Sequence, residues 1–316
     1  MKKRSLLHLL TVCCLLLALL AGCGGRDGEA PPDETPQETT VTDYYGHTVT
    51  FDSCPQRVAA VSGSLGEVWL DAGGTLIGVT QDALTERQLG LPEDTAILGT
   101  IKEPNLEVLL SLEPDFVILS ADIASHQSLA DTLREMGIPC GQFHEELFQD
   151  YLDLLAQFTA ITGREDLYQT NGLDGQTRIA EILETSRLEE PRTALLIRAY
   201  SSGFKAKGSD ILAGAMLADF GFVNVLDQYD SLLEDISLEE IIRVDPDAIF
   251  ITTMGSDTQA ALDNLSRTLE SNPAWSSLAA IENDQYFVLP KELFHYKPNA
   301  RWPDAYQYIA DLLSES

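Results

Sequence analysis

Two stretches of the sequence decide the fold: residues 105–120 read NLEVLLSLEPDFVILS, and residues 237–252 read SLEEIIRVDPDAIFIT. Most aligned positions exchange like for like, and the identical pairs are Leu106/Leu238, Glu107/Glu239, Pro114/Pro246 and Asp115/Asp247. Each copy predicts a helix, a Pro-Asp turn and a buried strand. Chance, or a common βα motif, is the alternative explanation. Because the copies lie far apart, each inside its own run of strands and helices, we expect two related lobes.

Short apolar strands alternate with helices around both copies, which predicts an α/β fold with mainly parallel sheets flanked by helices. In the first round we expect strands at 58–62, 76–80, 116–120 and near Cys140, and helices at 65–73, 106–112 and 126–136. In the second round we expect strands at 193–198, 248–252 and 286–289, and helices at 211–220, 238–244, 259–270 and 303–313. Between the rounds, one long helix from about Arg164 to Arg187 would join the lobes and limit their relative motion.

The N-terminus has the pattern of a secretory signal peptide, because basic residues at 2–4 precede an apolar run at 6–20. An uncleaved membrane anchor is the alternative, since a spanning helix needs about 20 apolar residues. The sequence Leu-Ala-Gly-Cys at 20–23 resembles the lipobox of bacterial lipoproteins, which implies a lipid on Cys23. We therefore expect an exported protein, anchored to the outer face of the cell membrane by an N-terminal lipid.

Composition and pattern together divide the chain into five parts. Residues 24–41 are polar and rich in Pro, Gly, Thr and acidic residues, and such a segment buries too little apolar surface to fold. The expected parts are a signal peptide (1–22), a lipid-anchored disordered tether (23–41), an N-lobe (42–163), a linker helix (164–188) and a C-lobe (189–316).

The charge of the chain excludes one class of partner. The formal net charge is −30 at pH 7 and the sequence pI is about 4.2. Nucleic-acid binding needs clustered Lys and Arg to neutralise phosphates, so we expect no nucleic-acid partner. Besides Cys23, the mature chain retains Cys54 and Cys140. A disulfide between them is open in an oxidising compartment, although two buried thiols are the simpler expectation.

A family resemblance begins at residues 41–74, which read VTDYYGHTVTFDSCPQRVAAVSGSLGEVWLDAGG. This stretch resembles the opening of the helical-linker class of ABC-importer binding proteins, which serve iron–siderophores, haem and vitamin B12. The Pro-Asp turns match the two lobe repeats of that class, and the resemblance extends over residues 41–316. It implies a monomeric, non-enzymatic receptor without a cofactor, which delivers its ligand to a permease. A ferric siderophore is the favoured ligand, with haem or cobalamin as alternatives.

The resemblance also implies two docking groups, because in that class one carboxylate on each lobe contacts arginines of the permease. Glu67 matches the N-lobe position. The aligned C-lobe position holds Ala218, which leaves the neighbouring Asp219 as the candidate and Asp210 as a reserve. The alternative is that these are ordinary solvated carboxylates of an acidic chain.

Ligands of two-lobed α/β proteins lie beyond the carboxyl ends of the strands, between the lobes. In the second lobe, the segments that follow the predicted strands combine basic with aromatic side chains, which suits an anionic, ring-bearing iron complex. The alternative is scattered surface cations paired with nearby acids. The expected ligand-binding residues are Arg198, Tyr200, Lys205, Lys207, Tyr296, Lys297, Arg301 and Trp302, with Ser64 and Lys102 from the first lobe.

Other kinds of site are less well supported by the sequence. His295 beside Tyr296 is a weak candidate for direct iron ligation, since such a pair more often packs or forms hydrogen bonds. The histidines are dispersed, which disfavours a receptor for free zinc or manganese. Ser64 lacks the first glycine of a nucleophile elbow, which disfavours an exported hydrolase. A surface adhesin or sensor that works without an importer stays an alternative.

Overall fold

The computed structural model describes residues 38–228 and 236–315. The expected signal peptide, Cys23 and nearly all of the tether lie outside these residues. The disordered tether was predicted to extend too far: residues 39–41 belong to the first strand, β1 (Thr39–Thr42), because they pair with residues 49–51. Residues 38–316 belong to one compact unit. Within the described ranges, none of the helices combines the length and the apolar character that crossing a membrane requires.

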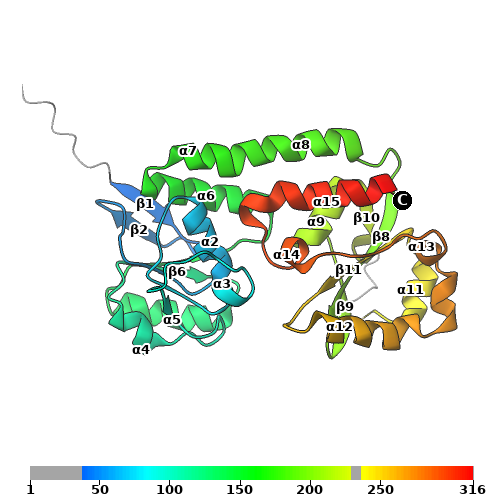
Figure 1. The fold of residues 1–316 in the computed structure, drawn as a ribbon, viewed down its shortest axis with the longest axis horizontal. Coiled ribbons are helices and arrows are strands. Elements are labelled where there is room, and N and C mark those ends of the chain that lie inside the picture. The colour runs from blue at the N-terminus through cyan, green and yellow to red at the C-terminus, as the bar shows by residue number, and fades with distance from the viewer. Residues whose placement is uncertain (1–37, 229–235, 316) are drawn as a thin grey trace, which may run out of the picture. The chain divides into compact units, whose positions relative to one another are not determined.

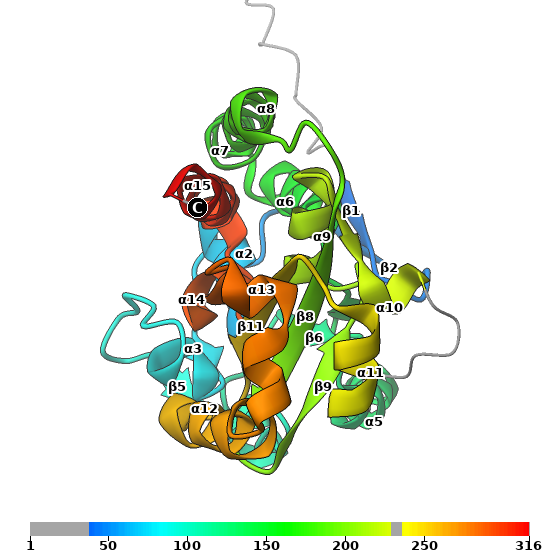
Figure 2. The same ribbon diagram turned by 90° about the vertical axis from the view of Figure 1, so that its right-hand side faces the viewer.

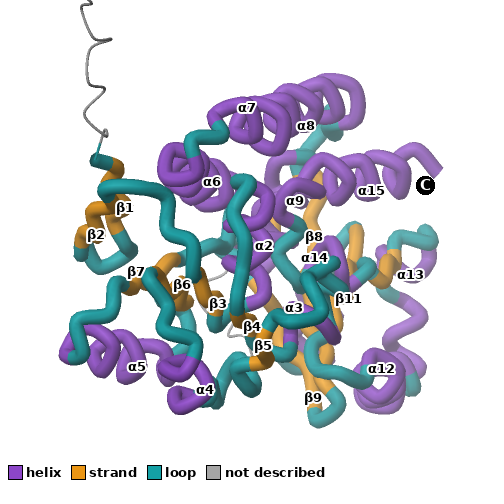
Figure 3. Tube along the Cα trace, turned by 60° about the vertical axis from the view of Figure 1, so that its left-hand side comes forward, coloured by secondary structure: helices purple, strands orange, loops and turns teal. Residues whose placement is uncertain are grey.

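The first sheet has the strand order β5-β4-β3-β6-β7, and all its neighbouring strands are parallel (Figure 3). β3, β6 and β7 are buried throughout, as expected for parallel strands covered on both faces. The strands are β3 (Val58–Ala60), β4 (Gly78–Val79), β5 (Ala96–Ile97), β6 (Phe116–Ser120) and β7 (Cys140–Phe143). The helices are α2 (Gly63–Asp71), α3 (Asp82–Thr85), α4 (Leu106–Ser111) and α5 (Ala124–Glu135). An antiparallel hairpin of β1 (Thr39–Thr42) and β2 (Thr48–Phe51) precedes this sheet.

The second sheet has the parallel order β10-β8-β11-β12, and β8 and β11 lie in the middle of their lobe (Figure 2). Its strands are β8 (Arg192–Tyr200), β9 (Gly203–Lys207), β10 (Phe222–Asn224), β11 (Ala248–Thr253) and β12 (Tyr286–Val288). The helices are α9 (Leu212–Asp219), α10 (Val225–Gln228), α11 (Leu238–Val244), α12 (Thr258–Leu265), η2 (Ser266–Glu270), η3 (Pro273–Ser277), α13 (Ala279–Glu282), α14 (Lys291–Phe294) and η4 (Asn299–Arg301). β9 was not expected: β8 runs on to Tyr200, and the chain then turns back along it as an antiparallel hairpin.

The lobes are joined through a layer of helices. The expected long helix is present as the continuous run of α7 (Glu165–Tyr168), η1 (Gln169–Leu173) and α8 (Asp174–Ser186), in which η1 is a π-helical turn. α6 (Phe148–Thr162) precedes it and ends at Gly163, whose φ of 69° suits glycine. α7 packs on α6, and α8 packs on the last helix, α15 (Trp302–Glu315) (Figure 1).

The sequence repeat has the same structural role in both lobes. The Asp115 carboxylate accepts a hydrogen bond of 2.9 Å from the backbone N–H of Arg57, just before β3. In the second copy, Asp247 accepts one of 2.7 Å from the backbone N–H of Thr193 in β8. In each lobe the strand that follows the aspartate also pairs with that neighbour, β6 with β3 and β11 with β8. The repeat therefore fixes the same pair of central strands twice.

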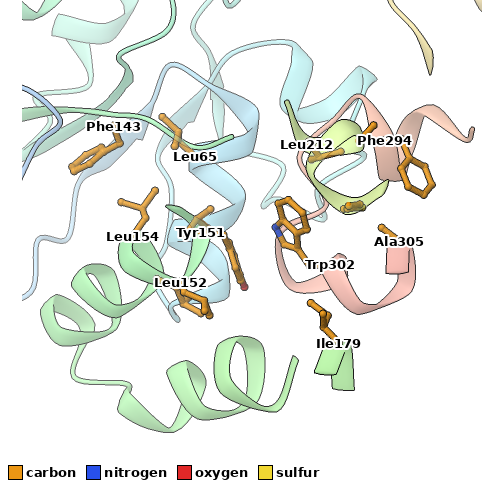
Figure 4. Packing of buried hydrophobic residues seen from close by; sticks show 14 of the residues in the cluster. Leu65, Phe143, Tyr151, Leu152, Leu154, Ile179, Leu212, Phe294, Trp302 and Ala305 are labelled. Carbon is orange, nitrogen blue, oxygen red and sulfur yellow. The ribbon is translucent and has the colours of Figure 1, made fainter. Parts of the chain in front are cut away.

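A single cluster of buried apolar side chains extends through both lobes and the helices that join them. It includes Tyr151 on α6, Ile179 on α8 and Trp302 on α15 (Figure 4). The same cluster contains Phe116 of the first sheet and Phe250 of the second. Because a wide separation of the lobes would expose part of this apolar surface to water, we expect their relative motion to be small.

The two cysteines of the folded region are free thiols, so the disulfide that the sequence left open is not formed. Cys140 is buried and Cys54 is half-buried. Burial raises the pKa of both thiols, which makes them poor nucleophiles.

Candidate ligand-binding site

The end of β8 and the returning β9 bring four of the expected ligand-binding residues together. Arg198 on β8 pairs directly with Lys205 on β9. Tyr200 and Lys207 each lie two residues further along their strand, and alternate residues of a strand point to the same face. The four side chains therefore share one face of the second sheet. Three of the four are basic, so this face of the second sheet is rich in positive charge.

The pKa of His295, which follows α14, depends on the charges around its side chain. Burial, followed by the charges of Arg198, Lys291 and Lys297, lowers the pKa of His295 to about 3. The imidazole is therefore neutral at physiological pH. A histidine that burial and three neighbouring cations keep neutral marks an electropositive region. We call Arg198, Lys291, Lys297 and His295 the cationic cluster.

Two polar atoms of the cationic cluster lack a hydrogen-bond partner. The Nε atom of Arg198 and the Nδ1 atom of His295 are buried, and neither is hydrogen-bonded to any part of the chain that the structure describes. A buried polar atom without a partner is costly, on the order of 1–3 kcal/mol. An anionic ligand with several oxygen acceptors could satisfy the Arg198 N–H, and a ligand hydroxyl could reach the imidazole.

The segment after α14 carries three more of the expected residues to a pocket between the lobes. The Lys291 ammonium lies 4.8 Å from the centre of the Tyr296 ring, a cation–π contact. The Lys297 ammonium forms an ion pair with Glu146. Arg301 is exposed, and its guanidinium donates to the Glu292 carbonyl at 3.4 Å. The pocket is lined by Glu67, Glu86, Arg87, Gln88, Glu292, Tyr296, Lys297 and Arg301.

The two first-lobe candidates lie at different depths. Ser64 is half-buried on α2, and its hydroxyl is 3.3 Å from that of Ser62. Lys102 is exposed in the loop that follows β5. Ser64 thus lies at the carboxyl end of β3, where a ligand between the lobes would sit, whereas Lys102 is a solvated cation.

The structure corrects the expected role of Trp302. Its side chain is 1% exposed, belongs to the core cluster that joins the lobes, and stands 5.5 Å from the Phe148 ring, centre to centre (Figure 4). The Trp302 ring is enclosed by core side chains, so no ring face is left for a ligand to stack on, and its Nε1 atom is also buried without a hydrogen-bond partner in the part of the chain that the structure describes. Trp302 is therefore a packing residue, and its position beside Arg301 in the sequence does not place it in the pocket.

Replacing Trp302 with Phe tests this correction. We expect Trp302→Phe to keep the affinity for the ferric siderophore that the sequence favours within about twofold, while the smaller ring fills the core less well and lowers the free energy of unfolding by about 1 kcal/mol. Fluorescence titration and urea unfolding measure the two quantities. An affinity loss of about tenfold or more without greater destabilisation would restore Trp302 to the site.

The two docking candidates are less free than the sequence suggested. Glu67 forms an ion pair with Arg87, and its Oε2 accepts a hydrogen bond of 3.0 Å from the Asn299 side chain. Its side chain is 22% exposed. Asp219 is exposed at the end of α9, and its carboxylate accepts a hydrogen bond of 2.6 Å from the Tyr306 hydroxyl. Burial and this bond raise the pKa of Tyr306.

Several residues of the site were missed by the sequence reasoning. Lys291 begins α14, three residues after the end of β12, and is absent from the expected ligand-binding residues. Arg87 and Glu146 belong to the first lobe and lie outside the expected strand-end segments. Asn299 has a left-handed backbone, with φ of 52°, and the residues beside it in the sequence give no signal of this conformation. Only Lys291 had a signal that could have found it, its position after a predicted strand.

Direct iron ligation by His295 is disfavoured by its surroundings. Within residues 38–228 and 236–315, no three His, Cys, Asp or Glu side chains are grouped so that they could hold a metal ion. The positive charges around His295 would also repel a bare cation.

Comparison with known proteins gives the family. The family described as "periplasmic binding protein" matches residues 58–293. The Fe(3+)-citrate-binding protein YfmC of Bacillus subtilis (strain 168) is 24% identical over 291 residues, which cover 90% of this chain and 89% of that protein.

Two solved structures have a similar fold. Staphylococcus aureus SirA complexed with staphyloferrin B has a TM-score of 0.66 and 20% identity, over 88% of this chain and 97% of that one. Staphylococcus aureus IsdE complexed with heme has a TM-score of 0.67 and 14% identity, over 81% and 98%. With the paired sheets, the helical linker and the site between the lobes, these matches establish that the chain belongs to the periplasmic binding protein family, in the class that its sequence resembles.

Proposed function

We propose that this protein is the extracytoplasmic substrate-binding subunit of an ABC importer, and that it binds a ferric complex of an anionic chelator between its lobes. A ferric siderophore is our first candidate. The observation that carries the proposal is the cationic cluster, with its buried Arg198 Nε and His295 Nδ1 atoms still lacking partners. Such a cluster is unexpected in a chain of net charge −30 unless an anion occupies it.

The site favours oxygen-rich chelates over a flat aromatic cargo. Charge-assisted hydrogen bonds from Arg and Lys to carboxylates or other anionic oxygens are strong and directional. The aromatic contribution is smaller than the sequence suggested, because Trp302 belongs to the core. The names of YfmC and of the SirA complex, which specify ferric citrate and staphyloferrin B, agree with this chemistry. Haem, as in the IsdE complex, and cobalamin are the alternatives.

The rest of the proposal concerns place and partners. Residues 1–22 direct export, Cys23 carries the lipid, and the residues between Cys23 and β1 tether the folded part to the outer face of the cell membrane. The protein acts as a monomer, and Glu67 and Asp219 are the candidate contacts with the permease. Family and relatives are substrate-binding proteins rather than enzymes, so we assign no catalytic step and no cofactor.

Titration of the intrinsic tryptophan fluorescence of the purified protein tests the ligand class. The ligands are ferric citrate, a ferric catecholate and a ferric hydroxamate siderophore, haem and cobalamin, each with its iron-free or apo form as the control. We expect binding at about micromolar concentration or below for at least one ferric chelate, and weaker binding of the iron-free chelator. The absence of a fluorescence change with every iron complex, together with tight binding of a sugar or an amino acid, would contradict the proposal.

A further inference from the structure

Five side chains make a connected set of polar contacts between the two lobes. They are Glu67 on α2, Arg87 after α3, Glu146 after β7, and Lys297 and Asn299 in the segment between α14 and α15. We call these five residues the inter-lobe clamp. None of the family's expected ligand or docking roles requires them to be linked to one another.

Arg87 makes the first link. Its Nη1 atom forms the ion pair with Glu67 and also donates a hydrogen bond of 2.9 Å to the backbone carbonyl of Lys297. The Arg87 side chain is only 8% exposed. A guanidinium that is this well buried and bonded on both sides of the lobe junction fixes the backbone at residue 297.

Asn299 makes the second link. It is fully buried, and its Nδ2 atom donates hydrogen bonds of 3.0 Å to the Ser64 carbonyl and 3.0 Å to Glu67 Oε2. Both acceptors lie on α2, at the carboxyl end of the first lobe's central strand β3. The turn that contains Asn299 is thus held against the first lobe at two points.

Glu146 makes the third link, from the opposite direction. One of its carboxylate oxygens pairs with the Lys297 ammonium, and the other accepts a hydrogen bond of 2.9 Å from the backbone N–H of Leu212 at the start of α9. Lys297 is therefore held by its carbonyl, through Arg87, and by its ammonium, through Glu146. The held residue is also a member of the cationic cluster.

We propose that Arg87 and Asn299 are positioning residues, which hold the Lys297 segment against the first lobe and thereby set how fast a bound anionic ferric complex leaves. This inference rests on the proposed function. Neither residue belongs to the cationic cluster, so their loss leaves Arg198, Lys291 and His295 in place. Arg87 also lines the pocket, whereas Asn299 does not, so Asn299→Gly tests the positioning role without removing a charge from the pocket. Contacts that keep a site assembled act mainly on dissociation, whereas encounter depends on diffusion and the overall charge field.

Stopped-flow fluorescence with ferric citrate tests the inference in Arg87→Ala and Asn299→Gly. Glycine is chosen because φ at Asn299 is 52°, which glycine adopts without strain, and because this change leaves the charge unaltered. We expect each variant to raise the dissociation rate constant about tenfold and to leave the association rate constant within about twofold. Arg87→Lys, which keeps the charge but loses the branched geometry, should restore only part of the loss.

The matched control is Arg164→Ala. Arg164 is an exposed arginine whose partner, Asp166, lies in the same helical segment and makes no contact between the lobes. The association and dissociation rate constants of Arg164→Ala should equal those of the wild type. Unchanged dissociation in both Arg87→Ala and Asn299→Gly, or a loss confined to association, would overturn the assignment.

A measurement without ligand separates this inference from the proposed function. Hydrogen–deuterium exchange of residues 296–301 in the ligand-free protein should be about tenfold faster in both variants and unchanged in Arg164→Ala. If none of the ferric chelates binds the wild type, the proposed ligand class is wrong, and the exchange data still decide on the clamp. Exchange equal to that of the wild type in both variants would show that the clamp does not hold this segment.

Discussion

Arg198→Glu should weaken the binding of ferric citrate by about 100-fold or more, the largest effect that we expect from a single change in the site. The Arg198 Nε atom is buried without a partner, so we expect a bound anion to accept a charge-assisted hydrogen bond from the Arg198 side chain. The glutamate removes that bond and adds repulsion between like charges. Tryptophan fluorescence titration at fixed ionic strength measures the change.

The fold should tolerate this reversal, because Lys205 lies directly opposite position 198 and gives the new carboxylate a cationic neighbour. Thermal unfolding checks that point. Arg164→Glu is the control, since it makes the same charge change at an exposed arginine away from the cluster. Equal affinities of the wild type and Arg198→Glu would remove Arg198 from the site.

Glu145→Gln should stabilise the protein at about pH 8 by roughly 2–3 kcal/mol. Glu145 is 3% exposed, and neither carboxylate oxygen has a hydrogen-bond partner in the part of the chain that the structure describes. Burial raises the pKa of Glu145 to about 7, and the charges of Arg87 and Lys297 offset only part of that effect. The native state therefore holds a proton that the unfolded state has already released, since the ordinary glutamate pKa is 4.5.

The sign of the pH dependence follows from this difference. Between about pH 4.5 and 7 the native protein binds more protons than the unfolded chain, so the free energy of unfolding contributed by Glu145 falls as the pH rises. Glutamine does not titrate, so Glu145→Gln does not lose this free energy as the pH rises. Near pH 4.5 its free energy of unfolding should approach that of the wild type. Burial and the neighbouring Glu67 also raise the pKa of Asp71 to about 7. Part of the decrease in the free energy of unfolding with rising pH therefore remains in both proteins.

Urea unfolding at about pH 5 and pH 8 measures the difference between the two proteins. Glu103→Gln, at an exposed loop position, is the control and should behave like the wild type at both pH values. A Glu145→Gln variant that is less stable than the wild type at the higher pH would show that the native Glu145 carboxylate has a stabilising partner, and would contradict this prediction.

Much of the fold could be predicted because its signals are local. Each copy of the repeat contains its own cap, turn and apolar strand, and the strand at Phe116–Ser120 and the helix at Leu238–Val244 lie where they were expected. The hairpin of β8 and β9 was missed for a physical reason. The alternation of Phe204 and Ala206 with two lysines is typical of a strand, but the basic residues suggested a loop that follows a strand.

The site was only partly predictable, because it depends on the direction of single side chains. Arg301 and Trp302 are adjacent in the sequence, yet one is exposed and the other is 1% exposed, since consecutive helical residues point about 100° apart. Periodicity cannot settle this at the first turn of a helix, where few residues define the face. The contacts of Arg87 and Asn299 depend on packing between distant segments and leave no local pattern.

The most direct test of the account is anomalous diffraction at the iron absorption edge from crystals grown with ferric citrate. We predict an iron peak between the lobes, held by chelator oxygens that contact Arg198 and one or more of Lys291, Lys297 and His295. An iron peak on the outer surface, or one coordinated directly by protein side chains away from these residues, would contradict it.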